Sequence, residues 1–273
     1  MRNLLSHMVC VLLFTSGFSY GQLSRLDEVD QRLAVDRNQK ILSSTVIIPD
    51  PEIDKQLKNI AERIARTSYF SRYAFPPRIF YLGEPIVNAM SGGAGLVYVF
   101  NGLVRVVQNN GGILAFVVGH EMAHNCMQHA AKTYLRRVAF EAEYRRLRSQ
   151  DPRSALAYKV AWYITEKKIE RDQENEADRL GLRAAAQAGY HPDYAILAAR
   201  ALRQELPYHS KFVTFFYLNH PRWITREERT EKSYTEALGI FETFWPNAAA
   251  SPGGTPPPLA IVAPVAPTRW NQA

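Results

Sequence analysis

The stretch His120-Glu121-Met122-Ala123-His124 constrains this chain more than any other feature of its sequence. One helical turn separates its two histidines, so on a helix their imidazoles project from the same face and can bind one cation. Glu121 is offset from that pair by about 100° around the helix axis, which places its carboxylate within reach of a water molecule on the metal. This H-E-x-x-H pattern predicts the metal-binding helix of a zinc hydrolase, and it requires a third protein ligand elsewhere in the chain.

The third ligand is expected in the acidic cluster Glu174-Asn175-Glu176-Ala177-Asp178. Glu174 and Asp178 are four residues apart on a predicted helix and therefore share a face. We expect Glu174 to bind the metal and Asp178 to accept a hydrogen bond from the outer ring nitrogen of a ligand histidine, which sets the histidine tautomer. Glu176 falls near the opposite side of the helix, and we expect it to face solvent. Two imidazoles, one carboxylate and an open fourth position suit one Zn2+ ion per chain.

Two further residues follow the motif on the same predicted helix. His129 comes nine residues after His120, about 180° around a continuous helix, so we expect a structural role for it and exclude it from the ligands. Cys126 comes six residues after His120 and is turned away from the ligand face, which is typical of a buried structural thiol.

The first 21 residues have the composition of a secretory signal. Arg2 supplies the positive start, Met8–Phe14 is an uninterrupted apolar run, and Ser19-Tyr20-Gly21 offers small residues for cleavage. The apolar run is shorter than the roughly 18 residues that a membrane span needs, which disfavours the alternative of an uncleaved anchor. We therefore expect export across the inner membrane and a periplasmic location.

Without residues 1–21 the chain has a net charge of +6, because Arg2 is removed from 33 basic residues while all 26 acidic residues stay. The excess is concentrated from Lys132 to Arg153, where glutamates interleave at helical spacing. A solvated helix face accounts for this pattern, and no aromatic-basic motif accompanies it, so nucleic acid is not an expected partner. Peripheral association with a membrane or an outer-membrane assembly stays open, and the sequence does not indicate the oligomeric state.

The predicted elements indicate an α+β fold that is predominantly helical, with a small β-sheet beside the metal helix. A helical arm over residues 22–49 belongs to one expected domain, residues 22–247, and the Pro/Ala-rich tail 248–273 is expected to be disordered. Strands are expected at Arg78–Leu82, Ile86–Met90 and Leu96–Phe100. Helices are expected from Pro51, from Ile113 to about Lys132, through a region interrupted at Asp151-Pro152, and from Ile169 to Ala188.

The active stretch and its surroundings resemble the gluzincin peptidases that include the CAAX prenyl proteases, HtpX, the mitochondrial Oma peptidases and the periplasmic BepA group. The segment His120–His129 is similar to the active helix of that family. Glu174 and Asp178 match its E-x-x-x-D element in residue type and spacing, and Glu176–Pro192 resembles its E-A-D-x-x-G…A-G-Y-x-P stretch.

Two more segments extend the likeness, which covers roughly residues 50–235. Asn88–Leu103 resembles the segment that forms the family's substrate-binding edge strand, and His220-Pro221 with Arg226 resembles its H-P-x-x-x-x-R element. We expect neither a multi-span membrane region nor a helical-repeat tail after His220. The expected branch is therefore a soluble, BepA-like one without that tail.

The resemblance implies a zincin-like zinc metalloendopeptidase. Glu121 would act as general base, His220 would donate to the oxyanion, and Arg226 would be its electrostatic partner. An alternative places His220 in the open position of the zinc ion, which would keep the enzyme latent.

The strand Leu96–Phe100 is expected to bind substrate by adding an extended polypeptide to the sheet. Core packing explains its composition nearly as well. Its side chains alternate, with Leu96, Tyr98 and Phe100 on one face and Val97 and Val99 on the other.

The leading hypothesis is an endopeptidase that acts on unfolded or misassembled envelope proteins in protein quality control. A chaperone-like binder of misfolded envelope proteins with a latent zinc site is the alternative. Metal binding without a polypeptide substrate is a weaker third hypothesis, because it leaves Glu121 without a task.

Overall fold

The computed structural model describes residues 20–71, 73, 75–205, 223–246 and 248. Its mostly helical architecture with one small sheet confirms the expected α+β class. The strands are β1 (Arg78–Leu82), β2 (Ala89–Gly93) and β3 (Leu96–Phe100). The helices are α2 (Tyr20–Ser44), α3 (Pro51–Ala65), α4 (Asn101–Val106), α5 (Gly111–Cys126), α6 (His129–Gln150), α7 (Pro152–Gln187), α8 (Asp193–Glu205) and α10 (Trp223–Phe244).

The sheet has the strand order β1-β3-β2. β3 pairs with β1 in parallel and with β2 antiparallel, so it is the central strand. A tight turn at Gly93, Ala94 and Gly95, all with positive φ, joins β2 to β3. The second strand lies three residues later than the expected Ile86–Met90, because the serine and glycines read as a turn are themselves paired with β3.

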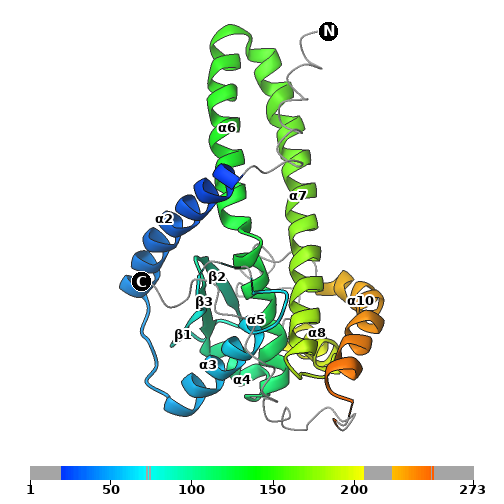
Figure 1. Ribbon diagram of the computed structural model, residues 1–273. Coiled ribbons are helices and arrows are strands. Elements are labelled where there is room, and N and C mark those ends of the chain that lie inside the picture. The colour runs from blue at the N-terminus through cyan, green and yellow to red at the C-terminus, as the bar shows by residue number, and fades with distance from the viewer. Residues whose placement is uncertain (1–19, 72, 74, 206–222, 247, 249–273) are drawn as a thin grey trace.

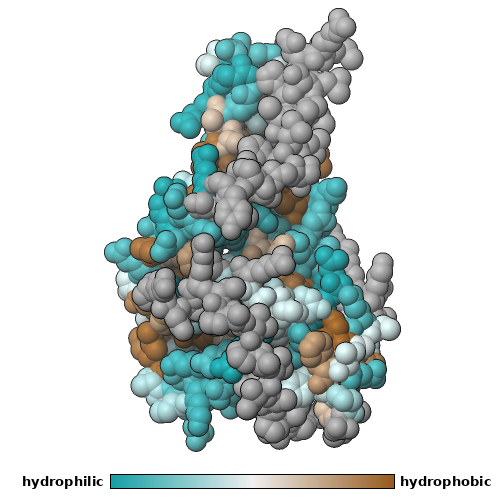
Figure 2. Space-filling view, viewed as in Figure 1, coloured by the Kyte–Doolittle hydropathy of each residue, from teal (hydrophilic) through white to brown (hydrophobic). Residues whose placement is uncertain are grey.

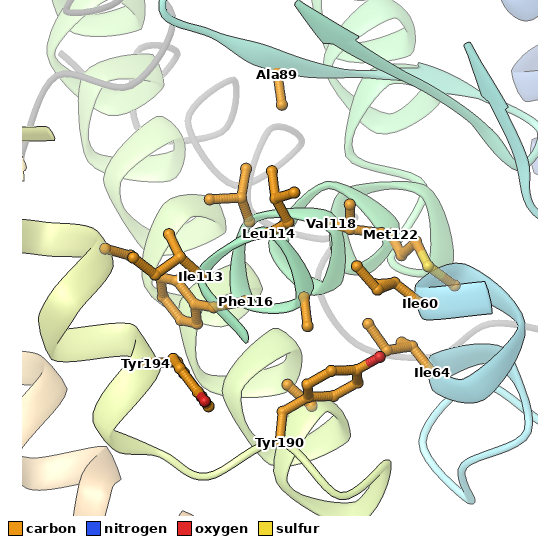
Figure 3. Close-up of a cluster of buried hydrophobic side chains, with 14 of the residues drawn as sticks. Ile60, Ile64, Ala89, Ile113, Leu114, Phe116, Val118, Met122, Tyr190 and Tyr194 are labelled. Carbon is orange, nitrogen blue, oxygen red and sulfur yellow. The ribbon is translucent and has the colours of Figure 1, made fainter. Parts of the chain in front are cut away.

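Helix α5 lies in the middle of the core (Figure 3). Ile113, Leu114, Phe116, Val118 and Met122 project from it in different directions, toward α3, the sheet and the tyrosines that follow α7. Apolar residues occur on all sides of α5, and a helix of this kind has to be buried on all sides, as it is here. The expectation of a central, buried metal helix is confirmed.

The two faces of β3 pack against different layers. Val97 and Val99 belong to the main core with α5, while Leu96, Tyr98 and Phe100 form a second cluster with Ala34 of α2. The expected alternation is therefore confirmed. Within α2, the Asp30 carboxylate accepts a hydrogen bond from the Ala94 amide at 2.8 Å, which holds the helix against the β2–β3 turn.

Helices α6 and α7 form an antiparallel hairpin that extends away from the part of the molecule that contains the sheet (Figure 1). Asp151 ends α6 and caps α7 by accepting from the Arg153 amide, and Pro152 occupies the first turn, where no amide donor is needed. The break at Asp151-Pro152 is as predicted. Beyond it, α7 is one helix of 36 residues, which corrects the expected separate helix at Ile169–Ala188.

Residues 1–19 of the expected signal and the expected tail after Ala248 lie outside the described residues, whereas the boundary expected after Gly21 falls within α2, which begins at Tyr20. Helix α2 occupies most of the expected arm at 22–49. No helix in the described ranges contains an apolar stretch long enough to cross a membrane.

Candidate metal centre

Helix α5 carries three of the expected site residues in its second half. Its start is defined by Asn110, whose side-chain oxygen accepts from the amides of Gly112 and Ile113 at 3.0 and 3.1 Å. The Nε2 atoms of His120 and His124 face each other at 3.1 Å. Residues one turn apart thus present two imidazole nitrogens to one point, as the H-E-x-x-H spacing predicts.

Glu174 reaches the same point from α7. Its carboxylate oxygens lie 3.7 Å from His120 Nε2 and 3.3 Å from His124 Nε2. One donor atom from each of these three residues lies within 4.8 Å of the others. Two imidazole nitrogens and one carboxylate oxygen, converging and largely buried, fit zinc in chemistry and in number.

The crossing of α5 and α7 depends on two glycines. A Cβ atom built on Gly181 would lie 2.7 Å from both the carbonyl carbon of Gly119 and the amide nitrogen of His120. One built on Gly119 would lie 3.0 Å from the Gly181 carbonyl oxygen. Because neither helix has a side chain here, the backbones approach closely, and the acidic face of α7 comes within reach of the histidines.

Glu121 lies beside the metal ligands. Its Oε1 atom is 4.0 Å from His120 Nε2, and its side chain is 4% exposed. A carboxylate next to the metal position and shielded from bulk water has the placement expected of a general base.

Asp178 contacts one of the two ligand histidines. Its Oδ1 atom lies 2.9 Å from His120 Nδ1, the ring nitrogen that points away from His124. The sequence left open which histidine this aspartate would contact, and the structure assigns it to His120.

His129 does not lie on the side of the metal helix opposite His120, where its spacing predicts it. Helix α5 ends at Cys126, and Gln128 takes a left-handed conformation at φ 51°, so α6 starts in a new direction at His129. The expected helix from Ile113 to about Lys132 is therefore wrong. As a result, His129 Nδ1 lies 2.9 Å from His124 Nδ1, although it is not among the ligands.

Glu176 is the partner of His129. The Glu176 Oε2 atom lies 3.1 Å from His129 Nε2, which corrects the expectation that this glutamate only faces solvent. Burial lowers the pKa of His129 to about 4, so the ring is neutral near pH 7. The hydrogen bond from His129 is the main cause of the lowered pKa of Glu176. No glycine or asparagine at position 128 signals the left-handed residue, so the sequence pattern could not indicate this contact.

Strand β3 does not have the free edge that was expected of it. All five residues Leu96–Phe100 pair with β1, and β2 pairs along its other side, so the prediction that they form a substrate-binding edge strand is wrong. The edge strand that contacts α5 is β2. Asn125, next to His124, accepts a hydrogen bond from the Gly93 amide and donates one to the Leu96 carbonyl oxygen, both at 2.8 Å.

Two expected site residues are not placed by the structure. His220 lies outside the described residues, and for Arg226 only the backbone, in α10, is described. Their proposed roles stay predictions.

Cys126 is partly buried at the end of α5, with its Sγ atom 3.8 Å from the Tyr69 carbonyl oxygen. Burial raises the pKa of this thiol to about 11.

Comparison with known proteins identifies the family to which this arrangement belongs. The model of Peptidase family M48 matches residues 51–233. The mitochondrial metalloendopeptidase OMA1 of Arabidopsis thaliana is 30% identical over 149 residues, which make up 55% of this chain and 30% of that protein. The mitochondrial metalloendopeptidase OMA1 of Bos taurus is 28% identical over 182 residues, or 60% of this chain and 34% of that protein. The chain thus spans about a third of the length of these relatives. Both are Oma peptidases, and the expected BepA-like branch stays a prediction.

Proposed function

This chain belongs to peptidase family M48, and we propose that it is a zinc-dependent endopeptidase that hydrolyses unfolded or misassembled proteins of the cell envelope. The observation that carries the proposal is the convergence of His120 Nε2, His124 Nε2 and the Glu174 carboxylate, with the Glu121 carboxylate beside them. Metal binding alone would leave the buried Glu121 without a task.

The chain's own residues supply the positioning and the proton transfer. His120, His124 and Glu174 would hold the zinc ion, which when bound acts as a Lewis acid and lowers the pKa of water to about 7. Glu121 would accept a proton from the attacking water at its carboxylate and deliver it to the nitrogen of the leaving amine. Asp178, at 2.9 Å from His120 Nδ1, would keep that ring turned with Nε2 toward the ligand position.

Strand β2 is a better candidate than β3 for binding an extended substrate. It is an edge strand, it contacts α5, and Asn125 connects it to the turn of helix that carries His124. Main-chain hydrogen bonds to such an edge are indifferent to side-chain identity, which suits a peptidase that acts on unfolded polypeptides. One acceptor on the strand, the Ser91 carbonyl oxygen, already accepts from Arg37 Nη1 at 3.0 Å, so a substrate would have to pair beside that contact or displace it.

A periplasmic location and a role in envelope protein quality control are parts of the same proposal. They are supported by the signal-like composition of residues 1–21. The two OMA1 relatives are named as mitochondrial proteins.

The surface of the α6–α7 hairpin suits peripheral association with a membrane. Residues 129–171 contain 11 basic and five acidic side chains. Leu156, Val160 and Ile164 share one face of α7 and are each more than half exposed. In Figure 2 the surface of the described part of the hairpin is mostly teal, with some brown apolar side chains. A basic helix with an apolar stripe binds anionic lipid surfaces. Sedimentation with anionic vesicles, compared with neutral ones, tests this, and a Leu156→Ser/Ile164→Ser variant that still binds equally well would contradict it.

The experiment that tests the function is cleavage of an unfolded model protein by the wild type and by Glu121→Gln, with the zinc content of both measured. We expect both to hold one zinc ion and only the wild type to cleave. If both hold zinc, neither cleaves and both bind the unfolded protein, the alternative of a chaperone-like binder with a latent site is favoured.

A further inference from the structure

The two ligand histidines are oriented by different numbers of groups. His120 turns Nε2 toward His124 and Nδ1 toward Asp178, a direct contact between a ring and a carboxylate. His124 likewise turns Nε2 toward His120, but its Nδ1 faces a second imidazole, His129, whose far nitrogen faces Glu176. The ring centroids of His124 and His129 are 4.9 Å apart, and the ring planes are nearly perpendicular, at 77°.

We propose that His129 and Glu176 are positioning residues of the metal centre, and that the Glu176 carboxylate sets the tautomer of the ligand His124 across the intervening ring of His129. This inference rests on the proposed zinc site and goes beyond it, because it concerns two residues that do not touch the metal position.

His124, His129 and Glu176 form a row of three side chains joined by two contacts. If His124 binds a metal, only one distribution of protons satisfies both contacts. To bind a metal through Nε2, a neutral His124 must carry its proton on Nδ1. That proton points at His129 Nδ1, which must then be the acceptor, so His129 carries its own proton on Nε2. The Nε2 proton in turn points at the Glu176 carboxylate, an acceptor when ionised.

The reverse distribution is disfavoured by the charge of Glu176. If His129 donated from Nδ1, His124 would carry its proton on Nε2 and could not bind a metal there. His129 Nε2 would then be an acceptor facing a carboxylate that is also an acceptor, 3.1 Å away. Because His129 is only 5% exposed, water has little access to compensate for this repulsion. The carboxylate therefore favours the tautomer that leaves His124 Nε2 free.

Two features of the fold bring His124, His129 and Glu176 together. The left-handed Gln128 ends α5 and turns His129 back beside His124, and the packing of α6 against α7 brings Glu176 to the other side of the ring. Glu176 and Asp178 are two residues apart on the same helix, so α7 supplies Glu174 as a ligand and one orienting carboxylate for each ligand histidine.

The test uses Glu176→Gln and His129→Phe in the full chain, with Glu170→Gln as the matched control. Glu170 is on the same helix, is 38% exposed as Glu176 is, and pairs with the exposed Lys167. Glutamine can donate as well as accept, so it removes the selection between tautomers while keeping size and position. Zinc affinity is measured by competition with a chelator, and the tautomer of His124 by ring 15N NMR of the metal-free protein.

We expect Glu176→Gln and His129→Phe to weaken zinc binding roughly tenfold to a hundredfold, while Glu170→Gln leaves it unchanged. In metal-free wild type, His124 should carry its proton on Nδ1, and in Glu176→Gln the two tautomers should mix. A merely structural role would not move that spectrum. The inference is overturned if Glu176→Gln keeps both the wild-type zinc affinity and a pure Nδ1–H tautomer. A wild type that binds no zinc would instead contradict the proposed function, and the tautomer spectrum would still decide the role of Glu176.

Discussion

Gly119 and Gly181 bring the backbones of α5 and α7 into direct contact at the metal centre. The closest approaches of an added Cβ on Gly181 are to backbone atoms of Gly119 and His120, at 2.7 Å, so no side chain could move aside to make room. This crossing places Glu174 and Asp178, within two turns of Gly181, beside the histidines of α5.

Replacing Gly181 by alanine should therefore separate the two helices. We expect Gly181→Ala to lower the free energy of unfolding by about 1–3 kcal/mol, the usual cost of overpacking, and to weaken zinc binding as well. Chemical denaturation and chelator competition measure the two effects. Gly239→Ala in α10 is the control, because nothing lies within 4 Å of its added Cβ, and there alanine should be neutral or stabilising by up to about 1 kcal/mol.

Asp178→Asn should weaken zinc binding through His120. The substitution keeps the size of the side chain but removes the charge that favours a proton on His120 Nδ1, 2.9 Å away. We expect a loss of affinity of roughly tenfold to a hundredfold in chelator competition. Asp172→Asn, an exposed aspartate on the same helix, should leave the affinity unchanged; equal losses in both variants would show an effect of overall charge.

Asn125→Ala should loosen β2 from the active helix. The side chain is 1% exposed and joins the Gly93 amide to the Leu96 carbonyl oxygen, so its removal leaves buried backbone groups without these partners. We expect a destabilisation of at least about 1–3 kcal/mol. If β2 binds the substrate, KM should rise more than kcat falls. The exposed Asn59→Ala in α3 serves as the control, and a fall confined to kcat would argue against a substrate role of β2.

The hairpin contains a bidentate ion pair, with Arg136 Nε and Nη2 donating to the two carboxylate oxygens of Glu166 at 3.1 and 2.9 Å. The glutamate side chain is 8% exposed, so Arg136→Met should leave a buried charge and lower the free energy of unfolding by about 3 kcal/mol. Arg136→Met/Glu166→Leu should restore most of that loss. A double variant as unstable as the single one would mean that shape, and not charge, governs this contact.

Cys126 should react slowly while the protein is folded. Because burial raises its pKa to about 11, little thiolate exists at pH 8, and the fraction grows as the pH rises toward that value. We expect iodoacetamide to modify the Cys126 peptide much more slowly in the native protein than in urea, as followed by mass spectrometry. Equal rates in the two states would contradict this environment.

The sequence by itself determined the chemistry of the centre, because that chemistry depends on local periodicity. One helical turn between His120 and His124 puts both rings on one face in any helix, and the same spacing pairs Glu174 with Asp178. The composition of α5, apolar on all sides, likewise requires burial on all sides. The helical class, the central metal helix and the presence of a small sheet follow from such patterns.

Only the tertiary structure decided which strand is the edge and what lies behind the ligands. The pattern of Leu96–Phe100 is the same in a central and an edge strand, and strand order depends on pairing partners distant in sequence. A single left-handed residue, Gln128, turned His129 from the far side of a presumed helix to within 2.9 Å of His124. One backbone angle that no residue type signals redirects every residue after it, and the second contact of His129, with Glu176, exists only once α7 packs alongside.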